Sequence, residues 1–350
     1  MIVVARFGLA LLLVCALGCN SSSPTRPDDD DDAPPATNPP VTGEIVTGTA
    51  VSAFTDGGAP SIAIATNGTT LGSSAADGTF RVGFTASGNN RITMSGGGFV
   101  ERQTGIQAPS TNLRLSLIPS SFNLNAFNEM FRHTTIGGAL GLTRWTAPPK
   151  LLIERRVLQF STLGAASYTA LNETLTDAEV ASITADLREG YALLTAGRLG
   201  TFASVETRTS APGAAVAVSA PGFIVVTRQV GLTDEENFWG YARWSTTPDG
   251  EVTRGFILLD RDFERSASPY HASLRMHELG HTLGCQHVSL PARSVMNSNA
   301  QTEPNTFDQQ AARLAMLRPL GNRAPDVDPA GTSATTASGR ARTETWHAAR

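Results

Sequence analysis

The sequence contains no cluster of Lys or Arg residues, and its formal net charge is −4 at pH 7. Proteins that follow a nucleic-acid backbone gather basic residues on one face, because those residues neutralise phosphates. We therefore expect no nucleic-acid partner. Hydrophobic residues make up 41% of the 350 positions, which is enough for the cores of two domains. No internal repeat is apparent, and we expect a monomer.

Long hydrophobic runs are also lacking. The apolar run Phe7–Leu17 follows Arg6 and ends at Gly18, and it is shorter than the roughly 20 residues that a membrane-spanning helix needs. The pattern predicts an export signal over residues 1–18. Residues 16–19, Ala-Leu-Gly-Cys, resemble the lipobox of bacterial lipoproteins, although the order of Ala and Leu is reversed. The alternative is ordinary signal cleavage near Gly18.

The lipobox resemblance implies that Cys19 is acylated and anchors the protein to a lipid bilayer. It also implies a place in the bacterial cell envelope, at the outer membrane or the cell surface. The chain has only three cysteines. With Cys15 in the signal and Cys19 acylated, only Cys285 remains, so no internal disulfide can form. We interpret Cys285 as a small buried hydrophobic residue.

Two regions precede the mixed part of the chain. Residues 19–42 are rich in Ser, Pro and Asp, with five consecutive Asp at 28–32, and predict a disordered tether. Over residues 43–119, short β-branched runs separated by Gly, Asn and Asp predict an all-β sandwich of about seven strands. The pattern resembles carboxypeptidase-regulatory-like modules and contains no catalytic residues. Its expected role is that of a spacer or a binding module.

Residues 120–320 show a mixed α/β pattern. Thr176 and Glu179 have the spacing of a capping box and predict a helix start, and Ser268-Pro269 and Thr306 predict two more. Strands are expected at 150–160, 202–209, 222–227, 238–245 and 255–260. From 321 to 350 the sequence loses periodicity and predicts a disordered tail.

One segment within this region has the residue types of a metal site. His277 and His281 are four residues apart on an expected helix, so their side chains lie about 40° apart and one turn apart on the same face. Both imidazoles can therefore reach one ion. Glu278 points about 100° away from His277, which suits a general base that contacts the metal's water and not the metal itself.

His287 could not join this site on a continuous helix, because ten residues would place it roughly 15 Å along the axis from His277. Gly284 resolves the difficulty, since glycine tolerates the positive φ that ends a helix and turns the chain back. Three imidazoles with one open position are typical of catalytic zinc, whereas structural zinc usually has four protein ligands.

The segment from His277 to His287 resembles the extended zinc signature of the metzincin peptidases, and Ser294-Val295-Met296 resembles their Met-turn. The resemblance implies an α+β catalytic domain, with a mixed five-stranded sheet and two main helices, preceded by the small β-sandwich. It assigns Met296 to the floor under the metal. It also places residues 238–245 in an antiparallel edge strand where a substrate peptide can add. Ser298 stands where some metzincins have a Tyr ligand, so a matrixin-like site is nearer.

The predicted function is that of a zinc endopeptidase, with Zn²⁺ on His277, His281 and His287, Glu278 as general base, and a protein or peptide as substrate. The alternative is a surface binding or adhesion lipoprotein whose zinc only holds the domain together. Glu278 argues against that alternative, because a structural site has no need of a base.

Overall fold

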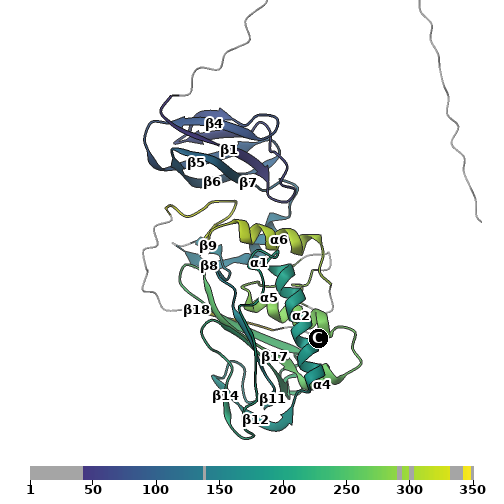
Figure 1. Cartoon of the computed structure of the whole chain (residues 1–350). Coiled ribbons are helices and arrows are strands. Elements are labelled where there is room, and N and C mark those ends of the chain that lie inside the picture. The colour runs from purple at the N-terminus through teal and green to yellow at the C-terminus, as the bar shows by residue number, and fades with distance from the viewer. Residues whose placement is uncertain (1–41, 137–138, 290–293, 299–302, 332–341, 348–350) are drawn as a thin grey trace, which may run out of the picture. The chain divides into compact units, whose positions relative to one another are not determined.

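The computed structural model of the chain describes residues 42–136, 139–289, 294–298, 303–331 and 342–347, and Figure 1 shows their arrangement. The predicted export signal, Cys19 and all but the last residue of the predicted tether lie outside the described residues. No helix in the described part of the chain is long and apolar enough to cross a membrane.

The first described region contains the seven strands that the sequence predicts between residues 43 and 119. They form two sheets, β4-β1-β7 and β3-β2-β5-β6. Along β4, Phe80, Val82 and Phe84 are buried while Thr79 and Arg81 are exposed, the alternation of a strand with one face in a core. The strands are β1 (Glu44–Ser52), β2 (Ala63–Thr66), β3 (Thr69–Ser73), β4 (Thr79–Phe84), β5 (Gly88–Gly96), β6 (Phe99–Ala108) and β7 (Ser110–Leu117).

The second region is built on one large sheet. Nine strands of the described chain belong to it, in the order β14-β12-β11-β15-β17-β16-β18, and β10 joins β13 to β15. The strands are β10 (Lys150–Glu154), β11 (Arg156–Gln159), β12 (Ser167–Thr174), β13 (Val205–Arg208), β14 (Ala215–Ala217), β15 (Phe223–Val230), β16 (Gly240–Thr246), β17 (Val252–Asp260) and β18 (Arg342–His347). A separate hairpin pairs β8 (Arg132–Ile136) with β9 (Ala139–Leu142).

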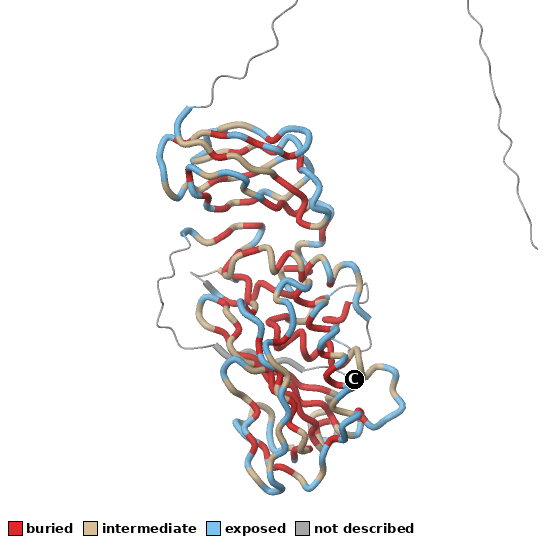
Figure 2. The backbone as a smooth tube through the Cα atoms, in the orientation of Figure 1, coloured by how far each residue is buried: buried red, intermediate tan, exposed pale blue. Residues whose placement is uncertain are grey.

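The central strands of this sheet consist largely of buried residues, as Figure 2 shows, and their side chains belong to two hydrophobic cores. In β17, Ile257 and Leu259 point into one hydrophobic core, whereas Phe256 and Leu258 belong to another. This alternation follows from the two-residue period of a strand, and it explains why β15 and β17 have almost continuous apolar sequences. Strands β10, β11 and β17 run parallel to β15, while β16 is antiparallel to β17.

Two helices cover the face of the sheet that carries Ile257. Leu187 and Tyr191 of α2 share the core of that face with Leu279 of α5. The described helices are α1 (Leu124–Phe131), α2 (Asp177–Leu194), α3 (Leu232–Glu236), α4 (Arg261–Arg265), α5 (His271–Thr282) and α6 (Thr306–Leu317). The predicted capping box at the start of α2 is present, since Thr176 Oγ1 accepts from the Glu179 N–H.

The predicted fold class, an α+β domain with a five-stranded sheet and two main helices, is wrong. Strands make up 41% of the structure and helices 21%, so β-sheet dominates the fold. Three differences enlarge the sheet. The run expected as one strand at 150–160 divides into β10 and β11. The eight-residue β12 and the three-residue β14 lie where no strand was expected, and β18 falls in the expected tail.

Ordered structure also continues past residue 320, into the segment expected as a disordered tail. Asn322 and Asp326 are fully buried. Arg318 forms an ion pair with Asp326 at 2.7 Å, and Asn322 Nδ2 donates to Asp328 Oδ1 at 2.7 Å. Paired charges and amides, not apolar periodicity, hold these residues. A search for hydrophobic patterns therefore misses them.

Candidate metal centre

Helix α5 carries the first part of the predicted site. It begins at His271, with Tyr270 at the N-cap and no side-chain capping bond, so the start expected at Ser268-Pro269 lies too early. Its residues from Leu274 to Thr282 are all buried, because the helix lies between the sheet and α2. His277, Glu278 and His281 have no exposed surface. The helix therefore holds three polar side chains inside the protein.

The structure brings the three predicted histidines together. The Nε2 atoms of His277 and His281 lie 3.1 Å apart, and His287 Nε2 lies 3.1 Å from the first and 3.2 Å from the second. A tetrahedral ion with bonds of about 2.0–2.1 Å to nitrogen sets its ligand atoms roughly 3.3–3.4 Å apart. The observed spacing is close to this value, so the donor set fits one divalent ion.

A glycine turn places His287 beside the other two rings. Gly284 has a φ of +101°, a conformation that favours glycine. The Gly284 N–H donates to the His281 carbonyl, and the Cys285 N–H donates to the Gly280 carbonyl, which together form a Schellman motif. The chain therefore leaves the helix axis after Leu283 and returns toward the metal face.

The outer nitrogens of two histidines are fixed by backbone carbonyls. His277 Nδ1 lies 2.7 Å from the Val295 oxygen, and His281 Nδ1 lies 2.9 Å from the Cys285 oxygen. Since a carbonyl only accepts, each Nδ1 donates, and the Nε2 lone pair is directed toward the shared centre. Burial, with the nearby His287, lowers the pKa of His277 to about 3. Its ring is therefore neutral at pH 7, the form that binds a metal.

The predicted Met-turn lies against the helix below the histidines. Met296 is fully buried, and its Sδ occupies the place that a Cβ on residue 280 would need. Only glycine at position 280 allows this contact. The turn is held by Asp308, whose carboxylate accepts from Ser294 Oγ at 2.5 Å and from the Val295 N–H at 3.2 Å. Val295 in turn orients His277.

Asp308 is a site residue that was not predicted from the sequence. It does cap α6, together with Asn305, which lies one residue before the predicted Thr306. Burial raises the pKa of Asp308 despite these hydrogen bonds. His133 was also missed: its Nε2 lies 2.6 Å from the Gly284 oxygen and 2.7 Å from Thr143 Oγ1. No sequence signal connects His133 to the turn, because 151 residues separate the two.

The two remaining predicted positions differ in their surroundings. Cys285 is fully buried, and burial raises the pKa of its thiol. A thiol that stays protonated is a poor metal ligand, which agrees with its interpretation as a small hydrophobic residue. Ser298 is exposed.

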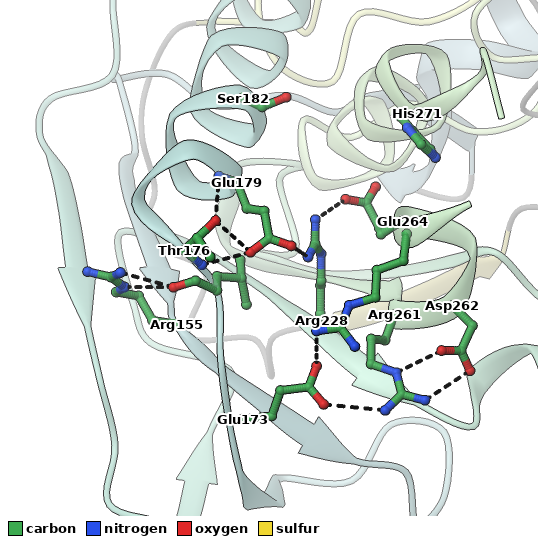
Figure 3. Close-up of polar contacts among 12 residues, drawn as sticks. Arg155, Glu173, Thr176, Glu179, Ser182, Arg228, Arg261, Asp262, Glu264 and His271 are labelled. Atoms are coloured by element: carbon green, nitrogen blue, oxygen red, sulfur yellow. Dashed lines mark hydrogen bonds and ion pairs between the residues drawn. The ribbon is translucent and has the colours of Figure 1, made fainter. Parts of the chain in front are cut away.

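A buried ionic cluster fixes the other end of α5. Arg275 pairs with Glu264 at 2.6 Å, and Glu264 also pairs with Arg228 at 3.0 Å. Figure 3 shows Arg228 reaching between Glu264 of α4 and Glu179 of α2. The side chain of Glu264 has no exposed surface. This cluster joins strand β15 of the sheet to helices α2, α4 and α5. It therefore sets the position of α5.

The comparisons with known proteins give little guidance. No family model and no curated protein matches the sequence. One similar solved chain comes from a type II cohesin–X-dockerin complex of Acetivibrio cellulolyticus, with 17% identity over 21% of this chain and 52% of that one. Another, from Bacteroides uniformis, is named for carbohydrate binding, with 14% identity over 38% of this chain and 65% of that one.

This chain therefore spans less than two thirds of either matched chain. The TM-scores are 0.17 and 0.18. Likenesses this low carry no argument about fold or function.

Proposed function

We propose that the protein is a zinc-dependent endopeptidase in which His277, His281 and His287 hold the metal and Glu278 is the general base. The observation that carries the proposal is the triangle of three Nε2 atoms, each within 3.2 Å of the other two. Three imidazole ligands leave a coordination place open, which is typical of catalytic zinc. The proposal rests on this site and not on a fold family.

The chain's own residues can perform the proton transfers of amide hydrolysis. Zinc held by these three histidines would supply a Lewis acid that polarises a carbonyl group and acidifies a water molecule. Glu278 follows His277 on α5, and its carboxylate lies next to Gly240 of β16. In the proposed mechanism Glu278 accepts a proton from the attacking water and then passes it to the leaving amine. The fixed Nδ1 bonds of His277 and His281 keep their rings oriented throughout.

A peptide is the proposed substrate because a strand adjoins the site. β16 lies beside α5, where the Trp244 ring stacks on that of His281 with centroids 6.0 Å apart. An extended peptide can bind a neighbouring strand through main-chain hydrogen bonds. As part of the same proposal, the protein is an exported monomer of the bacterial cell envelope, anchored to the bilayer by an acylated Cys19.

The test compares three variants for zinc content and for cleavage of casein. Glu278→Gln should keep zinc and lose activity by about 10²–10⁴-fold, the usual contribution of a general base. His281→Ala should lose zinc and activity together. His271→Ala is the matched control, since it lies on the same helix and its Nε2 lies 2.9 Å from the Phe263 oxygen. Undiminished cleavage by the Glu278 variant would remove that residue from the mechanism.

The same assay separates the alternative, a binding or adhesion protein with structural zinc. Strands β1–β7 enclose a hydrophobic core of their own, and such a β-sandwich could bind a partner without catalysis. Casein cleavage that stops on chelation and returns with zinc would favour the enzyme. Zinc-loaded, folded protein that cleaves nothing would favour the alternative.

A further inference from the structure

One strand of the large sheet comes from the far end of the sequence. β18 pairs antiparallel with β16, from Thr246 opposite Arg342 to Tyr241 opposite His347. The other edge of β16 pairs with β17. The metzincin resemblance implies an edge strand at residues 238–245, but in the described structure the outer edge of β16 is covered by a segment of the same chain (Figure 1).

The covered edge adjoins the candidate metal centre. An ideal Cβ on Gly240 would lie 2.5 Å from Glu278 Oε1, so the first residue of β16 contacts the proposed general base. Because the pairing is antiparallel, β18 runs toward this end of β16, and residue 347 lies opposite residue 241. The end of β18 therefore reaches the part of β16 that is nearest to Glu278.

A docked strand and an extended peptide need the same groups. Both bind through the main-chain N–H and C=O groups along the outer edge of β16, with little dependence on sequence. Two strands cannot use one edge together. A segment of the same chain also has an advantage over a free peptide, because tethering gives it an effective concentration on the order of millimolar.

We propose that β18 is a built-in competitor, which occupies the edge of β16 where an extended peptide would bind and must leave before that peptide can bind. This inference rests on the peptidase function proposed above, whose regulation it names. Loss or displacement of the C-terminal residues would then activate the enzyme. Pairing through the main chain also explains how β18 can compete with substrates of unrelated sequence.

The first experiment disrupts the main-chain hydrogen bonds between β16 and β18 in the full-length protein. The double substitution Thr343→Pro with Glu344→Pro removes two adjacent N–H groups, of which one faces β16 in any antiparallel ladder. The matched control, Thr343→Val with Glu344→Val, keeps both N–H groups and favours a strand. A third protein ends at Ala341 and lacks β18 altogether. Zinc content and kinetics on a fluorogenic peptide library are measured for each.

A competitor that occupies the edge in nine molecules of ten raises the apparent KM about tenfold. We therefore expect the proline variant and the shortened chain to have a KM at least about tenfold lower than the full chain, with kcat unchanged. The valine control should match the full chain. A strand that only supported the fold would instead lower kcat and zinc content when broken.

The second experiment needs no catalysis. A labelled synthetic peptide with the sequence of residues 342–350 is titrated into the shortened chain carrying Glu278→Gln. It should bind there at least tenfold more tightly than to the full-length Glu278→Gln protein. Added to the active shortened chain, the same peptide should inhibit competitively.

The outcomes separate the two proposals. If cleavage occurs but KM is the same in all proteins and the peptide does not bind, the competitor is overturned and the peptidase stands. If the peptide binds only the shortened chain but no protein cleaves any substrate, docking of β18 on β16 is supported and the peptidase proposal fails.

Discussion

Helix α5 passes between two buried polar clusters of opposite character. Around Arg275, each charge faces an opposite charge, with Glu264 paired to both Arg275 and Arg228. Around His281, three imidazole rings bring their Nε2 atoms within 3.2 Å of one another. In the first cluster, protein groups alone supply an oppositely charged partner for each charge. The second gathers lone pairs, an arrangement that a cation stabilises.

This difference indicates what each cluster contributes. Paired charges can fix a helix without any ligand, although their net value over apolar residues is small. Converging imidazoles, in contrast, are best explained by an ion that they share. We expect the ionic cluster to govern stability in the absence of metal and the histidine cluster to govern the response to metal.

The largest expected effect comes from breaking the ionic cluster at its centre. Glu264→Gln leaves the buried guanidinium groups of Arg275 and Arg228 without their shared carboxylate, and removal of one partner from a buried pair costs about 3–5 kcal/mol. Urea unfolding should show a lower midpoint. Zinc bound per folded molecule should not change. Asp262→Asn is the control on the same helix, because its side chain is 57% exposed, and equal midpoints for the two variants would contradict this account.

The next effect concerns metal removal. An ion that binds only the folded state contributes about 2.7 kcal/mol to stability when its free concentration is 100 times Kd. A chelator should therefore lower Tm in the wild type and by a similar amount in Glu264→Gln, but not in His281→Ala. A chelator response that survives in His281→Ala would show that the ion binds elsewhere.

A smaller effect tests the packing of Met296 against helix α5 next to the metal centre. Gly280→Ala places a methyl group where Met296 Sδ lies, and such overpacking costs about 1–3 kcal/mol. It should also weaken zinc binding, since Val295, next to Met296, accepts the Nδ1 bond of His277. Gly105→Ala is the control, because no atom lies within 4 Å of the added group.

A double-mutant cycle makes the Gly280 prediction specific. Shortening Met296 to Ala removes the atom that the new methyl group would meet, so the cost of Gly280→Ala should fall in that background. Strictly additive costs would place the strain somewhere other than at Met296.

The histidine site could be predicted because its geometry is local. The four-residue spacing fixes His277 and His281 on one face, and Gly284 indicates the turn that returns His287. His133 could not be found in this way, because 151 residues separate it from Gly284. Glu264 and Asp308 are nearer, 11 residues from Arg275 and 13 from Val295, but each lies outside the helix or turn that it contacts, so no spacing rule connects them. The same reason explains β18, whose pairing with β16 connects residues about a hundred positions apart.

The fold shows the same limit. The helix start at Thr176 was predicted from its capping box, and the seven strands before residue 119 from their turns. The number of strands in the large sheet was not predicted, because β12, β14 and β18 form through pairing with neighbouring strands and not through an apolar pattern in their own sequences. Strand propensity reflects packing against those neighbours.

The smallest expected effect on stability concerns Glu179, at the edge of the ionic cluster. It distinguishes the contribution of the Glu179 charge from that of its side-chain packing. Glu179 accepts hydrogen bonds from Thr176 and pairs with Arg228. Burial opposes its ionisation, but these bonds lower its pKa from 4.5 to about 2. A carboxyl group with a lowered folded pKa stabilises the fold above its unfolded pKa, and the contribution is lost as pH falls toward the folded pKa.

Glu179→Gln should therefore cost about 1 kcal/mol at pH 7, the usual value of a helix cap, and the difference from wild type should shrink between about pH 5 and pH 2. The measurement is urea unfolding of both proteins across this range. Glu189→Gln, an exposed position on the same helix, should show no such pH dependence. A cost for Glu179→Gln that stays constant down to pH 2 would mean that side-chain packing, and not the charge, holds the start of α2 against Arg228.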